Sequence, residues 1–372
     1  MYKCTIKKVA NCCKYVKLLL QCGAICSTIY VVWLCLYCAY KSYGLHECLG
    51  YEMVLVNLFL LHRGMFMDYK KLIKNRKTRN VILRLLSFIP DKMMLKLQYR
   101  IKMGRKLNLK NPTRFTEKLQ WYKLYYRDPK MIPCVDKYDV RQIIADAGFG
   151  NILTKCYGVY DRMEDIDFDA LPESFVMKDT LGGGGNSVIL VKEKHKADLE
   201  SIKKQLAAWV KLPYKTREGG REWPYYSGKK HRIIVEEFLH ADPEAGGLID
   251  YKFFCFQGRA ESVYGVADRK PGVEAGIGIF DRDFCKIPYE RVGEPLQRTL
   301  AKPDNYEQML AIAETLGKLF PHVRVDLFNV EGRILFGELT FFNASGYMHY
   351  DPDSYDGILG DYFELPEKYP NT

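Results

Sequence analysis

Two carboxylates near the C-terminal end of the chain lie in apolar surroundings. Asp326 and Glu338 each interrupt a run of β-branched and aromatic residues that is typical of a strand. If residues 331–333 form a three-residue hairpin loop, the two side chains oppose each other, whereas a two-residue turn places them on opposite faces. Opposed carboxylates repel unless a cation lies between them, and Mg²⁺ with phosphate oxygens is the expected cation. A salt bridge from Arg324 is the structural alternative.

A lysine followed by glycines forms a second chemical feature. Lys178 ends an apolar run, and four consecutive glycines come soon after it, namely Gly182, Gly183, Gly184 and Gly185. Backbone N–H groups that no side chain shields can bind phosphate oxygens, and Lys178 adds a positive charge for the same phosphates. The loop leads into another strand-like run and lacks the spacing of a P-loop or a dinucleotide-binding loop. The pattern predicts a hairpin flap over a triphosphate, with a mobile surface turn as the alternative.

A third feature is an apolar run that ends in two acids. Residues 233–239 finish with Glu236, Glu237, Phe238 and Leu239. The end of such a strand can offer backbone N–H and C=O groups to an adenine edge, and one carboxylate can bind ribose hydroxyls. Taken alone, an exposed strand end explains the same pattern.

The elements that must position these residues follow from the periodicity of the sequence. Strand-like runs lie at 175–178, 187–191, 232–239, 251–257, 261–267, 323–328 and 334–340. Apolar residues recur at helical spacing at 115–126, 140–147 and 304–319. Asp136 is expected to cap the second of these helices and Gly148 to end it. Helices combined with antiparallel hairpins indicate an α+β fold.

The chain changes character near residue 64. Residues 1–64 carry seven Lys or Arg, two Glu and eight of the 12 Cys, whereas the other residues contribute only +6 of the net charge of +11. Residues 18–40 contain no charged side chain and are numerous enough to span a bilayer, and the lysines before them favour a cytosolic N-terminus. Two interpretations stay open: a membrane anchor, or a misassigned translation start whose true position lies near Met65 or Met67.

The composition of the chain after residue 64 restricts the classes of function that this part can have. Its weak positive charge gives little support to nucleic-acid binding, and its four scattered cysteines indicate reduced thiols rather than disulfides. The triplets that contain Asp281 with Asp283 and Asp351 with Asp353 resemble DxD motifs, so a metal-dependent glycosyltransferase using a nucleotide-sugar is the rival enzyme. The non-enzymatic alternative is a membrane-anchored scaffold.

The order of these features resembles the ATP-grasp fold, and more narrowly the TupA-like ATP-grasp family of bacterial surface-polysaccharide loci. The stretches that carry the resemblance are LNLKNPTRFTEKLQWYKLYYRD from residue 107, DKYDVR from 136, REWPY from 221, DYKFFCFQG from 250 and VRVDLFNVEGRILFGELTFFNASG from 323. The resemblance implies an α+β ATP-grasp domain at 131–372, with two subdomains that grip ATP. A basic helical segment at 65–130 and the Cys-rich segment 1–64 precede it.

The resemblance also implies roles for individual residues. The nucleotide-binding residues are Lys137 and Lys178 for the ATP phosphates, Gly182 to Gly185 for the flap, and Glu236, Glu237, Phe238 and Leu239 for the adenine and ribose hinge. Asp326 and Glu338 match the Mg²⁺ ligands, and Thr340 or Asn343 stands where a third ligand is expected. Arg324 and Lys252 are candidates for contacting the transferred phosphate or the acyl phosphate.

The function that the resemblance implies is an ATP- and Mg²⁺-dependent carboxylate–amine ligase of bacterial cell-surface or capsular polysaccharide synthesis. Its expected partners are ATP, a small carboxylate and an amine, with an anionic sugar or lipid-linked glycan as substrate and no nucleic acid. The basic, aromatic loop 215–230, with Trp223, Tyr225 and Tyr226, either binds such a sugar or is an ordinary solvated loop. The expected location is the cytoplasm, with the cytoplasmic face of the inner membrane as an extension.

Overall fold

The computed structural model describes residues 83, 86–87, 89–183, 187–212, 220–226, 228–241, 247–268 and 275–370. The chain divides into two compact units, Met1–Ile82 with Gln98–Arg105, and Leu83–Leu97 with Lys106–Thr372. The candidate membrane segment at 18–40 lies outside the described residues. Within the described ranges, no helix is both long enough and apolar enough to cross a membrane.

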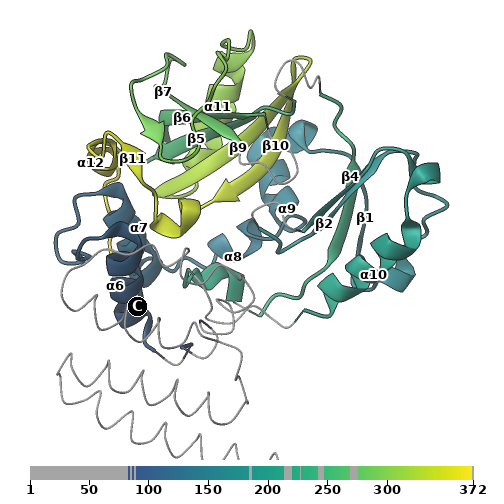
Figure 1. Ribbon diagram of the computed structural model, residues 1–372, viewed down its shortest axis with the longest axis horizontal. Coiled ribbons are helices and arrows are strands. Elements are labelled where there is room, and N and C mark those ends of the chain that lie inside the picture. Colours follow the sequence, from purple (N-terminus) through teal and green to yellow (C-terminus); the bar gives the residue numbers. More distant parts are fainter. Residues whose placement is uncertain are drawn as a thin grey trace, which may run out of the picture. The chain divides into compact units, whose positions relative to one another are not determined.

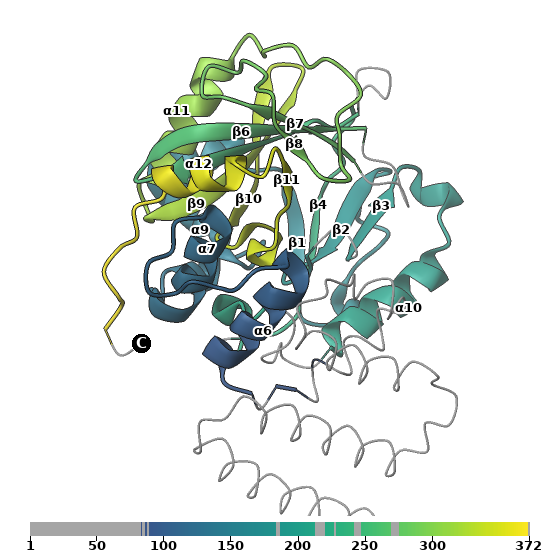
Figure 2. The same ribbon diagram turned by 60° about the vertical axis from the view of Figure 1, so that its left-hand side comes forward.

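Helices surround two main sheets (Figures 1 and 2). The α-helices are α6 Asp91–Met103, α7 Phe115–Tyr125, α8 Met131–Cys134, α9 Val140–Ile144, α10 Leu199–Val210, α11 Tyr306–Gly317 and α12 Tyr355–Tyr362. Short 3₁₀ or π turns are η1 Ala145–Phe149, η2 Gly150–Ile152, η3 Met163–Asp165, η4 Lys194–Lys196, η5 Trp223–Tyr226 and η6 Asn343–Gly346.

The predicted helices are present, with small differences at their ends. The Asp136 carboxylate accepts the backbone N–H groups of Tyr138 and Asp139, at 2.9 and 3.0 Å, and so caps the turn before α9. Gly148 has φ +90° and ends the helical segment. Helix α11 buries its predicted apolar face but ends at Gly317, so Leu319 lies beyond it and is 42% exposed.

A four-stranded antiparallel sheet, sheet A, has the order β1-β4-β2-β3. Its strands are β1 Cys156–Tyr160, β2 Phe175–Asp179, β3 Val188–Val191 and β4 Ile233–Glu237. Helix α10 packs on sheet A, and its Leu206 and Trp209 join Phe175, Met177 and Val235 in one apolar core. This core fixes the direction of β2 and β4, the strands that carry Lys178 and Glu236.

A five-stranded antiparallel sheet, sheet B, has the order β10-β9-β5-β6-β7. Its strands are β5 Asp250–Phe256, β6 Arg259–Ala267, β7 Gly276–Phe280, β9 His322–Val330 and β10 Arg333–Thr340; β8 Glu290–Arg291 and β11 Tyr350–Asp351 form a separate pair. Helix α11 packs on sheet B, with Met309 and Ile312 beside Phe253 and Val325 in a second apolar core. The α+β fold class is as the sequence predicted.

A neutral histidine lies inside the core of sheet B. The His322 ring is fully buried, stacks on Phe256 with centroids 4.8 Å apart, and meets Phe115 edge to face at 5.1 Å. Its Nδ1 lies 2.9 Å from the Cys255 carbonyl oxygen, which can only accept, so Nδ1 carries the proton. Burial lowers the pKa of His322 to about 3, with Arg324 adding to the shift.

This histidine predicts a specific pH dependence of stability. In the unfolded chain His322 is protonated below a pH of about 6.5, whereas in the folded chain it stays neutral until the pH nears 3. The contribution of neutral His322 to the free energy of unfolding is therefore fully present above pH 6.5 and is lost as the pH falls. Between pH 7 and pH 5 we expect His322 to lower the free energy of unfolding by about 2 kcal/mol. Urea denaturation of the wild type and of His322→Phe at both pH values measures this contribution, and an identical pH slope in the two proteins would contradict it.

Candidate active site

The β9–β10 hairpin has the shorter of the two turns that the sequence left open. Only Glu331 and Gly332 form the loop, and both have left-handed φ values, 52° and 80°. The three-residue loop at 331–333 is therefore absent. On strand alternation alone, this two-residue turn would place Asp326 and Glu338 on opposite faces of the hairpin.

A β-bulge in β10 changes that outcome. One extra residue, Gly337, lies between Phe336 and Glu338, and after it Glu338 pairs directly with Asp326. A Cβ atom at Gly337 would lie 3.0 Å from the carbonyl oxygen of Asp326, so only glycine fits without displacing the neighbouring strand. The two carboxylates thus oppose each other, through a bulge that the sequence analysis did not foresee.

Arg324 joins the two opposed carboxylates. Its Nε donates to Oδ1 of Asp326 and its Nη2 to Oδ2 of Asp326, both at 2.7 Å, and the same Nη2 lies 2.8 Å from Oε1 of Glu338. Asp326 is 1% exposed and Arg324 is 7% exposed. The salt bridge that was the structural alternative is therefore present, in a bidentate form that water reaches poorly.

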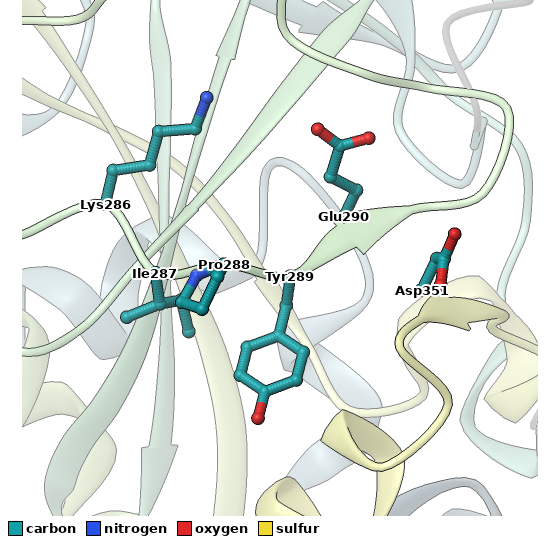
Figure 3. Close-up of a pocket in the computed structure, with 6 residues that line it drawn as sticks. All are labelled: Lys286, Ile287, Pro288, Tyr289, Glu290 and Asp351. Carbon is teal, nitrogen blue, oxygen red and sulfur yellow. The ribbon is translucent and has the colours of Figure 1, made fainter.

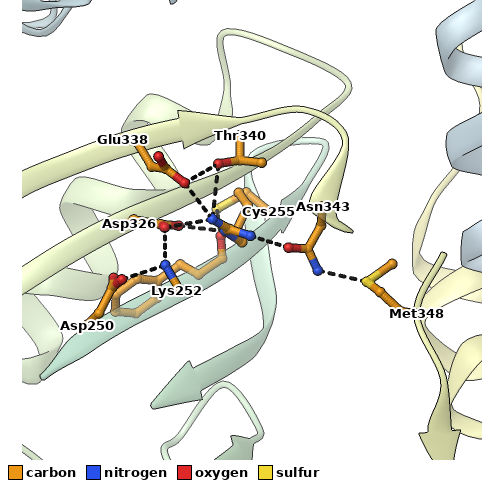
Figure 4. Close-up of polar contacts among 10 residues, drawn as sticks. Asp250, Lys252, Cys255, Asp326, Glu338, Thr340, Asn343 and Met348 are labelled. Atoms are coloured by element: carbon orange, nitrogen blue, oxygen red, sulfur yellow. Dashed lines mark hydrogen bonds and ion pairs between the residues drawn. The ribbon is translucent and has the colours of Figure 1, made fainter. Parts of the chain in front are cut away.

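Lys252 extends the cluster to a third strand. Lys252 on β5 pairs in register with Asp326 on β9, which pairs with Glu338 on β10, so the three side chains form a row across sheet B. The Lys252 Nζ donates to Asp326 and lies 2.5 Å from Oδ2 of Asp250 (Figure 4). The row therefore holds one positive group and two adjacent negative groups, and Arg324 contacts both of the negative groups.

Two residues were expected to supply a third metal ligand. The Thr340 hydroxyl donates to Oε1 of Glu338 at 2.8 Å and lies 3.0 Å from Arg324 Nη2. Asn343 is buried, its Oδ1 accepts from Arg324, and its amide nitrogen points to the sulfur of Met348 at 2.7 Å. Thr340 therefore lies against the carboxylate pair, whereas Asn343 positions the arginine.

Glu338 is both ionised and accessible. Burial alone would raise the pKa of Glu338. Nearby cations and a hydrogen bond outweigh burial and hold this pKa well below its usual range; they are Arg324, Lys252, the Thr340 hydroxyl and Lys137. The side chain of Glu338 is 51% exposed, unlike that of Asp326. An ionised and accessible carboxylate is what a cation ligand requires.

The two predicted phosphate lysines lie near each other. The Lys137 Nζ donates to the carbonyl oxygen of Gly182 and, at 3.2 Å, to that of Asp179, at the start of the glycine loop. Burial lowers the pKa of Lys137, the charge of Glu338 opposes this shift, and Lys178 adds to it. Lys137 therefore lies within electrostatic range of both Lys178 and Glu338.

Of the four glycines in the glycine loop, Gly182 and Gly183 belong to the described residues. The Gly182 N–H donates to the Asp179 carbonyl at 3.0 Å in a tight turn, and a Cβ atom at Gly183 would meet nothing within 4 Å. Gly184 and Gly185 lie outside the described residues. The flap role of all four glycines stays a prediction.

Glu236 is the centre of a buried ion network. Its Oε2 accepts from Lys178 at 2.7 Å, and its Oε1 accepts from the Thr154 hydroxyl at 2.7 Å and from Arg141 at 3.1 Å. Burial would raise the pKa of Glu236, but the charge of Lys178 and these hydrogen bonds lower it below its usual range. Glu236 therefore fixes Lys178 instead of reaching out from the strand end.

Glu237 connects the end of β4 to the β9–β10 hairpin. Its carboxylate accepts from Arg333 at 2.7 and 3.2 Å and from the backbone N–H of Lys155 at 2.8 Å. Phe238 and Leu239 follow the strand and are partly buried. Because both acids already have partners, we expect adenine to meet the backbone of Phe238 and Leu239. Their hinge role stays a prediction.

Helix α7 holds the loop that follows β10. Lys123 is 1% exposed, and its Nζ donates to the carbonyl oxygens of Ser345 and Gly220, at 2.7 and 2.8 Å. The Gln120 amide donates to Ser345 and Gly346, at 3.0 and 2.9 Å. The loop before η5 and the loop after β10 are thereby tied to one helix.

The predicted sugar-binding loop is in large part structural. The Arg221 guanidinium is buried and lies 2.9 Å from both Asp91 Oδ1 and the Ile89 carbonyl oxygen, and the Trp223 side chain is also buried. Burial raises the pKa of Tyr225 well above its usual range; the charges of Glu222 and Glu338 add to this shift, and Arg324 opposes it. The side chain of Tyr226 lies outside the described residues.

Sequence reasoning missed three members of these networks. Arg141 and Asp250 stand inside DKYDVR and DYKFFCFQG, two of the stretches that carried the family resemblance, so a signal for them was present. Thr154 has no such signal, because a lone threonine before a strand is common. Its contact with Glu236 bridges 82 residues of sequence.

The two DxD-like triplets of the rival glycosyltransferase lie in different surroundings. Asp281 accepts the backbone N–H groups of Asp283 and Cys285, at 3.0 and 2.8 Å, and so caps a turn after β7. Asp351 borders a hollow of about 470 Å³ whose lining is Lys286, Ile287, Pro288, Tyr289, Glu290 and Asp351 (Figure 3). In the part of the chain that the structure describes, no group of three or more His, Cys, Asp or Glu could hold a metal ion.

Comparison with known proteins gives the family. A family model described as TupA-like ATPgrasp matches residues 117–364, while no curated protein matches the chain. Among solved structures, the chain is similar to a D-alanine–D-alanine ligase from Bacillus anthracis, at 16% identity and a TM-score of 0.36 over 56% of this chain and 57% of that one. It is also similar to an L-amino acid ligase from Bacillus licheniformis, at 15% identity and a TM-score of 0.40 over 68% and 52%. The chain thus spans little more than half the length of these proteins, and the assignment rests on the family model.

The match places the fold among the ATP-grasp proteins, a class of ligases that bind ATP. Because it extends over more than half of the chain, the chain belongs to the TupA-like ATP-grasp family. The family, the fold and the enzyme class that the sequence predicted are confirmed. The roles of the individual site residues stay predictions.

The Glu236 network predicts that Arg141→Met alone lowers the stability more than Arg141→Met combined with Glu236→Gln. Arg141→Met removes one partner of a buried carboxylate, and we expect the free energy of unfolding to fall by about 2 kcal/mol. Adding Glu236→Gln removes the charge that was left poorly compensated, so the double variant should recover part of the loss. Urea denaturation measures both, with Arg162→Met, which breaks the exposed pair with Asp165, as a control that should change little. Equal losses in the single and double variants would contradict the network.

The bulge predicts that the site is sensitive to a side chain at residue 337. In Gly337→Val the new atoms meet the Asp326 backbone, so Glu338 should lose its place opposite Asp326. We expect the affinity for a non-hydrolysable ATP analogue with Mg²⁺ to fall at least about tenfold, a change of about 1.4 kcal/mol. The control is Gly332→Asn in the same hairpin, since Asn tolerates the left-handed φ of that turn. If calorimetry finds equal affinities for both variants, nucleotide binding does not depend on the bulge that places Glu338 opposite Asp326.

Proposed function

We propose that the chain is an ATP- and Mg²⁺-dependent carboxylate–amine ligase that acts in the synthesis of bacterial cell-surface or capsular polysaccharide. A carboxylate oxygen of the first substrate attacks the γ-phosphorus of ATP, ADP leaves, and an acyl phosphate forms. The amine nitrogen of the second substrate then attacks the acyl carbon, inorganic phosphate leaves with the carbon–oxygen bond electrons, and the nitrogen loses a proton. The product is an amide.

The observation that supports this proposal best is the row formed by Lys252, Asp326 and Glu338, with Arg324 between the two acids. Phosphoryl transfer needs little covalent chemistry from the protein and depends on positioning and charge neutralisation. A site that combines opposed carboxylates with an arginine and a lysine supplies charges of both signs for that purpose.

The donor atoms of this site suit Mg²⁺. Asp326, Glu338 and the neighbouring Thr340 hydroxyl offer oxygen atoms, which Mg²⁺ prefers, and Mg²⁺ is typically held by one or two carboxylates together with substrate phosphates. Asp326 and Glu338 would hold the ion, which supplies charge neutralisation for the phosphates. For a further oxygen we favour Thr340 over Asn343, because the Thr340 hydroxyl contacts Glu338 whereas Oδ1 of Asn343 accepts from Arg324.

The remaining residues have distinct tasks in the proposed reaction. Lys137, at the start of the glycine loop, and Lys178, fixed by Glu236, bind phosphate oxygens. Arg324 and Lys252 contact the phosphoryl group in transfer and the acyl phosphate. Phe238 and Leu239 orient adenine. None of these steps requires a protein nucleophile.

The substrate class is the finer part of the proposal. In the synthesis of a surface polymer, a uronic acid or a peptide supplies the carboxylate, and an amino acid or an amino sugar supplies the amine. Tyr225 belongs to the loop 215–230 with Trp223, and its ring and hydroxyl are the groups of this loop that we assign to contacting a sugar. ATP is made in the cytoplasm, where we place the reaction, at the inner membrane if the polymer precursor is lipid-linked.

A nucleotide panel tests this function. We would titrate the full-length protein by calorimetry with a non-hydrolysable ATP analogue, GTP and UDP-sugars, each with and without Mg²⁺. The expected result is Mg²⁺-dependent binding of the ATP analogue, weakened at least about tenfold by Lys178→Ala and by Asp326→Asn. Asp283→Asn is the matched control and should bind the analogue normally. UDP-sugar binding without ATP-analogue binding would reject the ligase and favour the glycosyltransferase.

A further inference from the structure

We propose that Arg324 competes with the divalent metal for Asp326 and Glu338, so that metal ion and nucleotide bind together and neither binds well alone. This inference rests on the proposed function, since it concerns the metal and the nucleotide of that site. It adds a coupling between the two ligands, for which the arginine is responsible.

The competition follows from how completely Arg324 occupies the carboxylates. Both oxygens of Asp326 accept hydrogen bonds from the guanidinium, at 2.7 Å each, and one oxygen of Glu338 accepts at 2.8 Å (Figure 4). A metal ion bound by these oxygens would lie next to a group with a full positive charge. A guanidinium does not give up its proton in proteins, so it must move or share its acceptors.

Burial makes this competition strong. Arg324 is 7% exposed and Asp326 is 1% exposed, so neither charge is well solvated if the pair is broken. Lys252 also donates to Asp326, which adds a second cation on the same carboxylate. A metal ion without its nucleotide would therefore leave Arg324 and Lys252 poorly compensated.

The phosphates of a nucleotide resolve the competition. They bring negative charge to which a guanidinium binds in the same forked geometry as to a carboxylate. Arg324 need not travel far to use it, because its Nη1 donates to Asn343, a contact that involves neither acid. The nucleotide thus provides partners for Arg324 while the metal takes the carboxylates.

A binding experiment on the full-length wild type comes first. Mn²⁺ serves as the metal probe, because its free form is counted by electron paramagnetic resonance, and a non-hydrolysable ATP analogue serves as the nucleotide. We expect Mn²⁺ alone to bind at least tenfold more weakly than in the presence of the analogue. By reciprocity, the analogue should bind at least tenfold more weakly in chelator than with metal. Equal Mn²⁺ affinity with and without the analogue would overturn the inference.

Variants assign the coupling to the arginine. Arg324→Gln removes the competing charge, so Mn²⁺ alone should bind about tenfold more tightly than to the wild type, and Arg324→Lys should give a smaller gain because it lacks the fork. Adding Glu338→Gln to Arg324→Gln should abolish the gain, which shows that the metal sits at the carboxylate pair. Arg282→Gln breaks an Arg–Glu pair elsewhere on the fold, with Glu314, and should leave Mn²⁺ binding unchanged.

The outcomes separate this inference from the proposed function. If the wild type binds no nucleotide at all, the proposed function fails, yet the comparison of Mn²⁺ alone on the wild type and Arg324→Gln still tests the competition. If the nucleotide binds but Arg324→Gln takes up Mn²⁺ no more tightly than the wild type, the ligase stands and the competition is wrong. Thermal melting of each variant shows whether it is folded.

Discussion

Two carboxylates opposed across one hairpin must be neutralised, and most of the site is arranged around that requirement. Asp326 and Glu338 would repel each other inside sheet B without the guanidinium of Arg324 and the ammonium of Lys252. Arg324 in turn depends on Asn343 and Thr340 for its direction. The position of Asn343 depends on the loop that α7 holds through Lys123 and Gln120. The neutralisation of the two carboxylates on β9 and β10 thus depends on contacts with α7, a helix some 200 residues earlier in the chain.

The sequence predicted those parts of the fold that local chemistry determines. Runs of β-branched and aromatic residues located the strands that carry Lys178, Glu236, Asp326 and Glu338, because each strand contributes to a core. The order of these residues along the chain was enough to point to the family. Strand β1 and helix α10 were not predicted, since β1 is partly exposed along its whole length and α10 buries only Leu206 and Trp209.

Side-chain partners were harder to predict, because they depend on register and on distant contacts. The sequence left the length of the turn at Glu331–Gly332 open, and the bulge at Gly337 opposes the two acids although the turn has only two residues. Glu236 was expected to face a ligand, but it lies among Lys178, Arg141 and Thr154. Nothing in the local sequence distinguishes a carboxylate at an exposed strand end from one that a distant arginine holds inside the protein.

The hydrogen bonds between α7 and the loop after β10 also determine which part of the chain could be moved into another protein as a working unit. A fragment that began at sheet A would contain every residue expected to touch ATP or metal except Lys137. It would also lack the Lys123 ammonium and the Gln120 amide, which hold the Ser345 and Gly346 carbonyls beside the site. The family match likewise begins at residue 117, inside α7. For chimeras, the boundary that preserves a working site therefore lies before that helix and not at the first strand.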